Sequence, residues 1–307
     1  MISSWNEYDP LKRIIVGDAT HANWPVHDPV FRAEEQNTLW KETPLPSGPV
    51  PQWIIDETNR DLQRLCTILT VHGVEVERPS TMNFQVHDGL YNYCPRDRFI
   101  VHGGIMIDTA MMYPCRDMEY QCYMDFLDEA EHIIHMPRNA GMVLDAANIL
   151  RVAKDKWLFL ESASGNRAAY DWLCKQVPDV GIELCNFYAG VHIDSTIVAL
   201  NEDCFVVNGS RIPGIEQLPR HLKGKEVLFV NEVVPQSFHE YPYASKWIAL
   251  NMLSIDPKTV IVDSKQADLI AVLEDHFGMK VIPLELRHSR TLGGGFHCVT
   301  LDLIRSL

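Results

Sequence analysis

The feature of this sequence that most restricts its fold is a β-type run that recurs five times along the chain. An apolar-periodic stretch leads into each run, and the five runs are GVEVERP at 73–79, EHIIHMP at 131–137, GIELCNF at 181–187, KEVLFVN at 225–231 and MKVIPLE at 279–285. Three of the preceding stretches have the spacing of amphipathic helices, and they are 55–71, 167–177 and 266–277. A unit that recurs along a whole chain is typical of repeat and propeller architectures.

Most of these helices are preceded by strands in which Val, Ile and Phe alternate with other residues. Three segments, 96–109, 148–162 and 195–208, each hold two such strands around a turn, as at Ala153–Lys156. Hairpins inside the units disfavour a doubly wound parallel sheet, the common outcome of alternating strands and helices. No glycine-rich phosphate loop follows the first strand either. We therefore predict an α/β fold of five ββαβ modules arranged in a circle.

No low-complexity linker divides the chain, so we predict a single domain over residues 1–307. One proline-rich segment, from Ala22 to Trp53, shows little periodicity. We expect this segment to be a long surface excursion, and the sequence does not decide whether it covers a site as a lid.

Composition and charge exclude several classes of protein. Hydrophobic residues make up 46% of the chain and charged residues 22%, which is the balance of a globular protein and not of a disordered one. The net charge of −14 repels a phosphate backbone, so nucleic acid is not an expected partner. No apolar run reaches the roughly 18 residues of a membrane helix, so no membrane is expected either.

The cysteines indicate a reduced protein. There are eight of them, but no CxxC pair is present and the first residues do not resemble a secretory signal. We therefore expect a cytoplasmic protein without disulfides or a structural zinc site.

The C-terminal stretch contains the strongest candidate for a nucleophile. Three successive glycines, 293–295, let the backbone approach a ligand closely, and Cys298 follows on what we expect to be a final strand. An arbitrary buried cysteine is most often an inert small hydrophobe, but the glycines favour a functional role here. His297 should point to the opposite face of such a strand, so the base must come from elsewhere.

His192 is the best candidate for that base. It lies at the start of an expected strand, where alternation puts His192 and Asp194 on one face. Asp145 and Asp97 occupy comparable positions in two earlier modules. A lone residue at such a place is most often a structural or turn residue, but the coincidence in three modules predicts a central site of carboxylates around one thiol. Carboxylates in a cleft bind cations, and a planar guanidinium pairs with them bidentately.

These residues fall in motifs that resemble the amidinotransferases, a family that includes the arginine:glycine and arginine:inosamine-phosphate enzymes. The motifs follow one another along nearly the whole chain, and they are SSWNEYDPLKRIIVG at 3–17, DAAN at 145–148, VHIDST at 191–196, SKW at 245–247, NML at 251–253 and LGGGFHC at 292–298. The resemblance implies a five-bladed, pseudo-symmetric α/β propeller of the pentein type, shared with the arginine deiminases. Asn148 replaces an Asp of the family's usual run, which is not the catalytic position.

By this resemblance, Cys298 is the nucleophile, His192 is the general acid and base, and Asp145 orients His192. Asp97 and Asp194 would hold the guanidinium of the donor, L-arginine. No cofactor and no metal ion are implied.

Three further positions would contact substrate by the same resemblance. Arg211 falls at the position that binds the donor's carboxylate, and Ser245 matches a substrate-contacting serine. Ala244 stands where the glycine enzyme has a second serine, so one polar contact is missing.

The resemblance also implies two-step covalent catalysis, with an amidino-cysteine intermediate, release of ornithine and transfer to an amine acceptor. In the glycine-specific enzyme, Asn-Pro-Met precedes the catalytic histidine, whereas this chain has Ala189, Gly190 and Val191. Met111, Met112 and Tyr113 add apolar surface at another place. We therefore expect a roomier, less polar pocket and an acceptor larger than glycine, as in natural-product biosynthesis.

Several alternatives stay open from the sequence. Glycine could still be the acceptor, a deiminase-type hydrolase could use the same residues to make citrulline, and a binding protein could hold guanidino compounds without turnover. The sequence does not give the oligomeric state, and a homodimer is one of the states that it allows.

Overall fold

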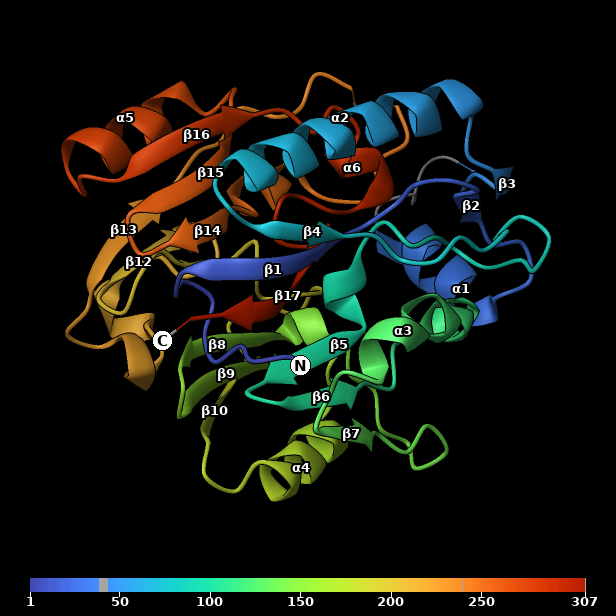
Figure 1. Cartoon of the computed structure of the whole chain (residues 1–307), viewed down its shortest axis with the longest axis horizontal. Helices are drawn as coiled ribbons and strands as arrows, with labels where there is room; N and C mark the ends of the chain where they lie inside the picture. Colours follow the sequence, from blue (N-terminus) through green and yellow to red (C-terminus); the bar gives the residue numbers. More distant parts are fainter. Residues whose placement is uncertain (39–43, 239, 307) are drawn as a thin grey trace.

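The computed structural model describes residues 1–38, 44–238 and 240–306. Within these residues, the strands of an α/β fold form five three-stranded sheets and one two-stranded sheet (Figure 1). The three-stranded sheets are β5 (Phe99–His102), β6 (Ile105–Asp108) and β7 (His132–His135); β8 (Ile149–Ala153), β9 (Lys156–Leu160) and β10 (Gly181–Cys185); β11 (Ile197–Ala199), β12 (Cys204–Asn208) and β13 (Glu226–Val230); β14 (Leu253–Asp256), β15 (Thr259–Asp263) and β16 (Lys280–Leu284); and β17 (Thr300–Arg305), β1 (Leu11–Val16) and β4 (Glu75–Glu77).

All five sheets are built alike. The middle strand pairs antiparallel with the first strand and parallel with the third, as β9 does with β8 and β10. In the last sheet, β1 occupies the middle between β17 and β4, so both ends of the chain complete one module. The predicted five-module α/β fold is therefore confirmed, and the pairing of β1 with β17 builds the fifth module from both ends of the chain.

Long helices make the parallel crossover in three of the modules. They are α2 (Gln52–Val71), α4 (Arg167–Gln176) and α5 (Ala267–Asp275), which agree closely with the three predicted helices. In the other two modules the ββαβ prediction is only partly right. The β6–β7 connection is a 3₁₀ helix, Pro114–Tyr123, followed by the short α3 (Met124–Leu127). The β12–β13 connection holds only 3₁₀ turns, because prolines and glycines recur between 209 and 224 and interrupt a helix.

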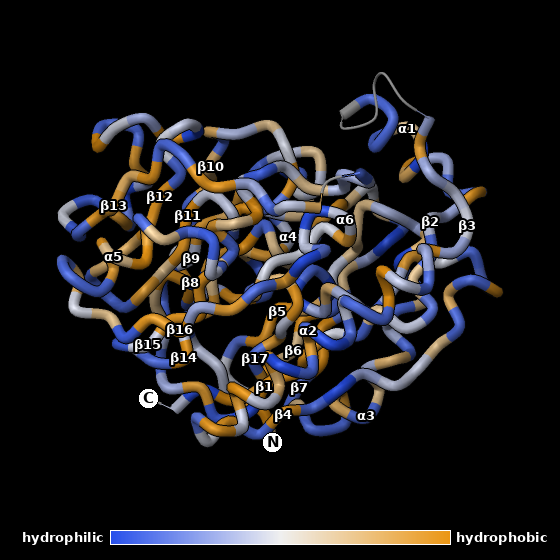
Figure 2. The backbone as a smooth tube through the Cα atoms, turned by 90° about the horizontal axis from the view of Figure 1, so that it is seen from above, coloured by the Kyte–Doolittle hydropathy of each residue, from blue (hydrophilic) through white to orange (hydrophobic). Residues whose placement is uncertain are grey.

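Each long helix packs its apolar side against its own sheet. In the module of β8, β9 and β10, Ala169 and Leu173 of α4 pack in one buried cluster with Trp157 and Phe159 of β9. Figure 2 shows the hydrophobic segments concentrated along the strands, while the outer loops are mostly hydrophilic. No helix in the described part of the chain is long and apolar enough to cross a membrane.

A buried network of charged side chains connects modules that lie far apart in the sequence. Arg151 of β8 donates hydrogen bonds to Glu7, at 2.8 Å, and to Asp302 of β17, at 3.0 Å. Arg305 donates to the same Asp302 at 2.7 Å. Buried charges are tolerated only when they are paired, so this network favours one relative placement of the modules.

The segment from Ala22 to Trp53 has more structure than expected, although residues 39–43 lie outside the described part. It contains β2 (Asn23–Trp24), α1 (Pro29–Thr38) and β3 (Gly48–Pro49). Helix α1 forms because Asp28 caps it: its carboxylate accepts hydrogen bonds from the backbone N–H groups of Val30 and Phe31. Pro29 at the first helical position is a second local signal for this helix.

Candidate active site

Every module begins with a turn that carries a polar side chain to one region of the molecule. The turns precede β5, β8, β11, β14 and β17, and their residues are Asp97, Asp145, Asp194, Asn251 and Cys298. Four of these side chains line a cavity of about 940 Å³, counting the open space at its mouth, and Asn251 is buried beside them. A cavity with several convergent polar side chains is typical of a small-molecule site.

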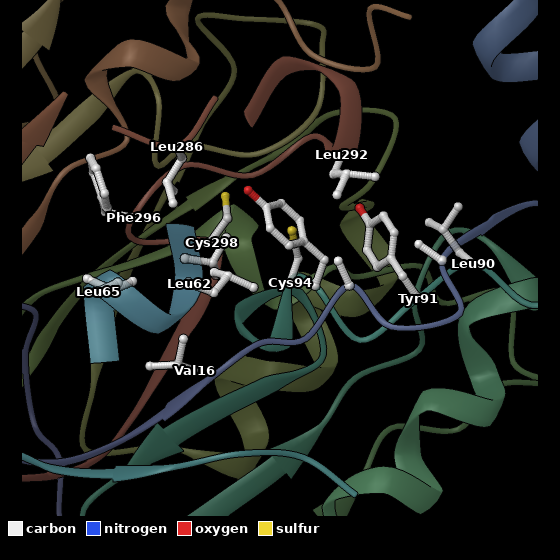
Figure 3. Close-up of a cluster of buried hydrophobic side chains, with 14 of the residues drawn as sticks. Val16, Leu62, Leu65, Leu90, Tyr91, Cys94, Leu286, Leu292, Phe296 and Cys298 are labelled. Carbon is white, nitrogen blue, oxygen red and sulfur yellow. The ribbon is translucent and has the colours of Figure 1, made fainter. Parts of the chain in front are cut away.

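Cys298 lies in the turn before β17 and not on the strand itself, so the expected strand position is wrong. It is 1% exposed, and its backbone N–H donates a hydrogen bond to the side-chain oxygen of Asn251 at 2.9 Å. The preceding glycines are required by close packing. A Cβ atom on Gly294 would lie 2.5 Å from the sulfur of Cys94, and Figure 3 shows Cys94 and Cys298 in one cluster of buried side chains.

His192 lies in the irregular loop before β11 and Asp194 in the turn that follows it, so the strand alternation predicted for the two residues is wrong, although both line the cavity. The backbone of His192 is left-handed, with a φ of 61°. Its Nε2 atom is 3.0 Å from Oδ2 of Asp145, and its Nδ1 atom is 3.8 Å from Oδ1 of Asp97. Burial lowers the pKa of His192, but these two carboxylates outweigh burial and raise the pKa well above its ordinary value.

Asp97 has one occupied and one open oxygen. Its Oδ2 atom accepts a hydrogen bond from Arg116 at 2.7 Å, while Oδ1 is buried without a hydrogen-bond partner among the described residues. Arg116 is itself held by a bidentate pair with Glu119, at 2.7 and 2.9 Å. An unpaired buried carboxylate oxygen is costly unless a ligand supplies a donor, so Asp97 is arranged to bind one.

Asp194 contacts the thiol directly. Its Oδ2 atom accepts hydrogen bonds from the Cys298 thiol at 3.1 Å and from Nδ1 of His297 at 2.8 Å. Burial raises the pKa of Asp194, but the interactions with His297 and His192 outweigh burial and lower the pKa to about 2. His297 does not line the cavity, and it supports the carboxylate that contacts the thiol.

The thiol of Cys298 is held in its neutral form. A hydrogen bond with Cys94, burial and the charge of Asp194 raise the pKa of Cys298 well above its ordinary value, and the hydrogen bond with His192 only partly offsets them. Only the thiolate is a strong nucleophile. Without a ligand, the cavity therefore holds a protonated thiol beside a cationic imidazole.

Asp97, His192 and Cys298 each offer a ligand atom, and these atoms lie within 4.8 Å of one another. Such a group of carboxylate, imidazole and sulfur could hold a soft divalent ion. The same three residues can equally surround the carbon of a planar cation. A carboxylate (Asp97), an acid or base (His192) and a nucleophile (Cys298) would then face that carbon.

A second wall of the cavity is built around Arg211. Its Nη1 atom donates hydrogen bonds to the hydroxyls of Ser195 and Thr196, at 3.1 and 2.5 Å, and its guanidinium lies 3.8 Å from the ring centroid of Tyr188. Ala244 and Ser245 also line the cavity, and their contacts with substrate stay a prediction. This wall can bind an anion.

Some expectations about the acceptor pocket change. Gly190 and Val191 line the cavity, but Ala189 is not one of the lining residues. Met111 and Met112 do not line it either. Tyr113 does, and it adds more than apolar surface because its hydroxyl donates a hydrogen bond to Glu35 of α1 at 2.7 Å. The segment from Ala22 to Trp53 therefore reaches the site through Glu35.

Sequence reasoning missed several residues around the cavity. Arg116 and Glu35 join the site only through the tertiary fold and carry no local signal. Asn251 lies in the NML motif at 251–253, and its position before the first strand of a module was the available signal. Cys94 immediately precedes the turn that carries Asp97.

No family model matches the chain, but known proteins match it over nearly its whole length. Inosamine-phosphate amidinotransferase 1 of Streptomyces griseus is 36% identical over 341 residues, which cover 100% of this chain and 97% of the relative. The solved structure of inosamine-phosphate amidinotransferase StrB1 from Streptomyces griseus has a TM-score of 0.90 at 34% identity, with 100% of this chain and 97% of that chain covered. SxtG, an amidinotransferase from Microseira wollei in the saxitoxin biosynthetic pathway, has a TM-score of 0.86 at 27% identity, with 99% and 97% covered.

Proposed function

Because the chain belongs to the amidinotransferase family, we propose that it moves the amidino group of L-arginine through a covalent adduct on Cys298 to an amine acceptor and releases ornithine. The observation that carries this proposal is the convergence of Asp97, His192 and Cys298 within 4.8 Å. The proposal treats residues 1–307 as one catalytic domain.

The carboxylates beside Cys298 and the wall around Arg211 suit the two ends of arginine. The open oxygen of Asp97 and the carboxylate of Asp194 are placed to accept hydrogen bonds from the guanidinium. Arg211 would pair with the donor's carboxylate, and Ser245 would contact the substrate beside it.

Binding of the donor would also activate the thiol. In the free enzyme, Asp194 accepts the thiol proton in a hydrogen bond and opposes ionisation of Cys298. A bound guanidinium would neutralise that carboxylate and place a positive charge beside the sulfur. Both changes lower the pKa of Cys298, so the thiol proton leaves to solvent and the thiolate forms where its target is bound.

In the first step, the Cys298 sulfur bonds to the guanidinium carbon, and this carbon becomes tetrahedral. The bond from that carbon to the side-chain Nε of arginine then breaks, while His192 gives its proton to this nitrogen. Ornithine leaves and an amidino thioether remains on Cys298. The raised pKa of His192 keeps that proton available, and the contact with Asp145 at 3.0 Å fixes the ring.

In the second step, the acceptor amine bonds to the amidino carbon and the bond from carbon to sulfur breaks. His192, now neutral, takes the proton from the attacking nitrogen, and Cys298 returns to the thiolate. The sulfur is almost fully buried, which limits the access of water to the adduct. This is the physical support for transfer over hydrolysis.

We propose further that the acceptor is larger than glycine and belongs to natural-product biosynthesis. Gly190, Val191 and Ala244 line the cavity with small or short side chains and leave room beside the reacting groups. The names of the similar proteins support this choice, since one acts on inosamine phosphate and another belongs to the saxitoxin pathway.

Product analysis tests the proposed function. The enzyme is incubated with arginine and in turn with glycine, lysine, diamines and amino alcohols, and ornithine, citrulline and ammonia are measured. We expect one ornithine for each guanidino product. Citrulline and ammonia in place of ornithine would show a deiminase, and a glycine kcat/KM about tenfold above the others would show guanidinoacetate formation.

A further inference from the structure

Helix α1 brings a buried carboxyl group to the cavity that the reaction does not use. Glu35 lines the cavity and is 5% exposed. Its Oε1 atom accepts a hydrogen bond from the Tyr113 hydroxyl at 2.7 Å. Its Oε2 atom is buried and has no hydrogen-bond partner among the described residues.

Among the described residues that line the cavity, no cation is placed to neutralise Glu35. Arg116 pairs with Asp97 and Glu119, and Arg211 donates to the hydroxyls of Ser195 and Thr196. The third lining cation, His192, pairs with Asp145 and Asp97. A buried carboxylate without an ionic partner is unfavourable, and a bound cation removes that cost. Burial raises the pKa of Glu35 to about 7. The hydrogen bond from Tyr113 lowers this pKa, and the nearby charge of Glu34 raises it. A cation beside Glu35 would therefore keep it ionised.

The position of Glu35 separates it from Arg211, the group that would hold the donor's carboxylate. Tyr113 follows Met112, whose backbone N–H donates to Asp145 at 2.8 Å, so Glu35 lies on the Asp145 side of the cavity. Burial lowers the pKa of Arg211, and the groups that partly offset burial are Tyr188 and Asp194 on the other wall. The α-ammonium and carboxylate of arginine are attached to one carbon, so the donor's ammonium must stay near Arg211.

We propose that Glu35 binds a second, positively charged group of the acceptor, which makes the acceptor a diamine or another amine that carries an additional ammonium. This inference rests on the proposed function. The reacting amine is neutral at His192 while the other amino group stays protonated at Glu35. An acceptor that carries a phosphate is disfavoured, because its charge would face the Glu35 carboxylate.

The experiment uses the full-length enzyme and separates the two half-reactions. With arginine alone, the ornithine burst reports the donor half. Putrescine and butylamine, which share a four-carbon chain but differ in the second amino group, are then compared as acceptors by kcat/KM, with phosphoethanolamine as an anionic amine. Glu35→Gln removes the charge with little change in shape, and Glu274→Gln makes the same change at an exposed position of α5.

We expect the wild type and Glu274→Gln to prefer putrescine over butylamine by about tenfold or more, and Glu35→Gln to lose that preference. Phosphoethanolamine should be the poorest acceptor. The arginine concentration that gives half of the burst should be the same in all three proteins, and an intact burst shows that the variant is folded.

Three results would overturn the inference. One is an equal kcat/KM of the wild type for putrescine and butylamine, a comparison that needs no variant. Another is an unchanged preference in Glu35→Gln. The third is a burst that needs much more arginine in Glu35→Gln, which would place the donor's ammonium at Glu35. A wild type with no burst at all would instead contradict the proposed function itself.

Discussion

The thiol of Cys298 donates a hydrogen bond to the carboxylate of Asp194 over 3.1 Å. The same oxygen of Asp194 accepts a hydrogen bond from His297 at 2.8 Å, so its position is fixed from behind. The carboxylate that would bind the substrate therefore also holds the nucleophile protonated until the substrate arrives.

This relationship predicts the pH dependence of thiol reactivity. In the free enzyme, alkylation of Cys298 by iodoacetamide should be slow at neutral pH and rise as the pH passes above the ordinary thiol pKa, because the pKa of Cys298 is raised. Asp194→Asn removes the negative charge and should move the rise to lower pH. Peptide mass spectrometry measures the rate at Cys298, and Cys298→Ala identifies the background. A rise that stays in place in Asp194→Asn would contradict this account.

Cys94 should affect the same thiol. The hydrogen bond with Cys94 is the largest cause of the raised pKa of Cys298, and Gly294 packs against the Cys94 sulfur. Cys94→Ala should therefore lower the pKa of Cys298 and speed its alkylation at neutral pH. Cys66→Ala is the matched control, since Cys66 is also buried but lies on α2. Equal alkylation rates in the two variants would exclude a role for Cys94.

Local patterns were enough to predict much of the fold. The helices α2, α4 and α5 follow from periodic apolar residues, and the hairpins β5–β6, β8–β9 and β11–β12 follow from alternation around turns. The pairing of β1 with β17 and the buried contacts of Arg151 with Glu7 and Asp302 join distant parts of the chain. Such contacts depend on the packed fold, and no local pattern marks them.

The site was also predicted only in part, because some of its residues lie in recognisable motifs and others meet only in the packed fold. Cys298, His192 and Asp145 were found through motifs, and the structure brings them to one cavity. The alternation argument for His192 and Asp194 failed because both residues lie in the loop before β11, where His192 has a left-handed backbone, and not on a strand. Arg116 meets Asp97 only through the fold, although both are buried and 2.7 Å apart.

Arg116 should be important for stability as well as for the site. Arg116→Met leaves Asp97 and Glu119 buried without their cation. The free energy of unfolding should fall by about 3–5 kcal/mol, which urea denaturation measures. Arg64→Met removes a pair with Asp61 in which the arginine is 58% exposed, and it should cost at most about 1 kcal/mol. Similar losses in both variants would contradict a buried ion-pair role for Arg116.

Glu35 should make the stability of the free enzyme depend on pH. Its pKa is about 7 in the folded protein against an ordinary value of 4.5, so the folded state binds the proton more tightly than the unfolded state. The stability that the protonated group contributes is complete below 4.5 and is lost as the pH rises through about 7. In the described part of the chain, the titratable groups that interact with it are Glu34, Tyr113 and Tyr243.

Glu35→Gln should therefore gain stability relative to the wild type as the pH is raised over this range. The relative gain should be on the order of 1–3 kcal/mol, measured by thermal unfolding without substrate at several pH values. Comparing the variant with the wild type at each pH cancels the other titrating groups. A difference that stays constant with pH would show that Glu35 ionises normally.

The most direct test of the central claim is intact-protein mass spectrometry of the enzyme mixed with arginine and no acceptor. The account predicts a mass increase of one amidino group, located on Cys298 by peptide mapping, with about one equivalent of ornithine released as a burst. Cys298→Ala should give neither, and an amine added to the labelled enzyme should remove the group. Ornithine that forms only when arginine and an amine are present together, with no adduct on Cys298, would contradict the covalent mechanism.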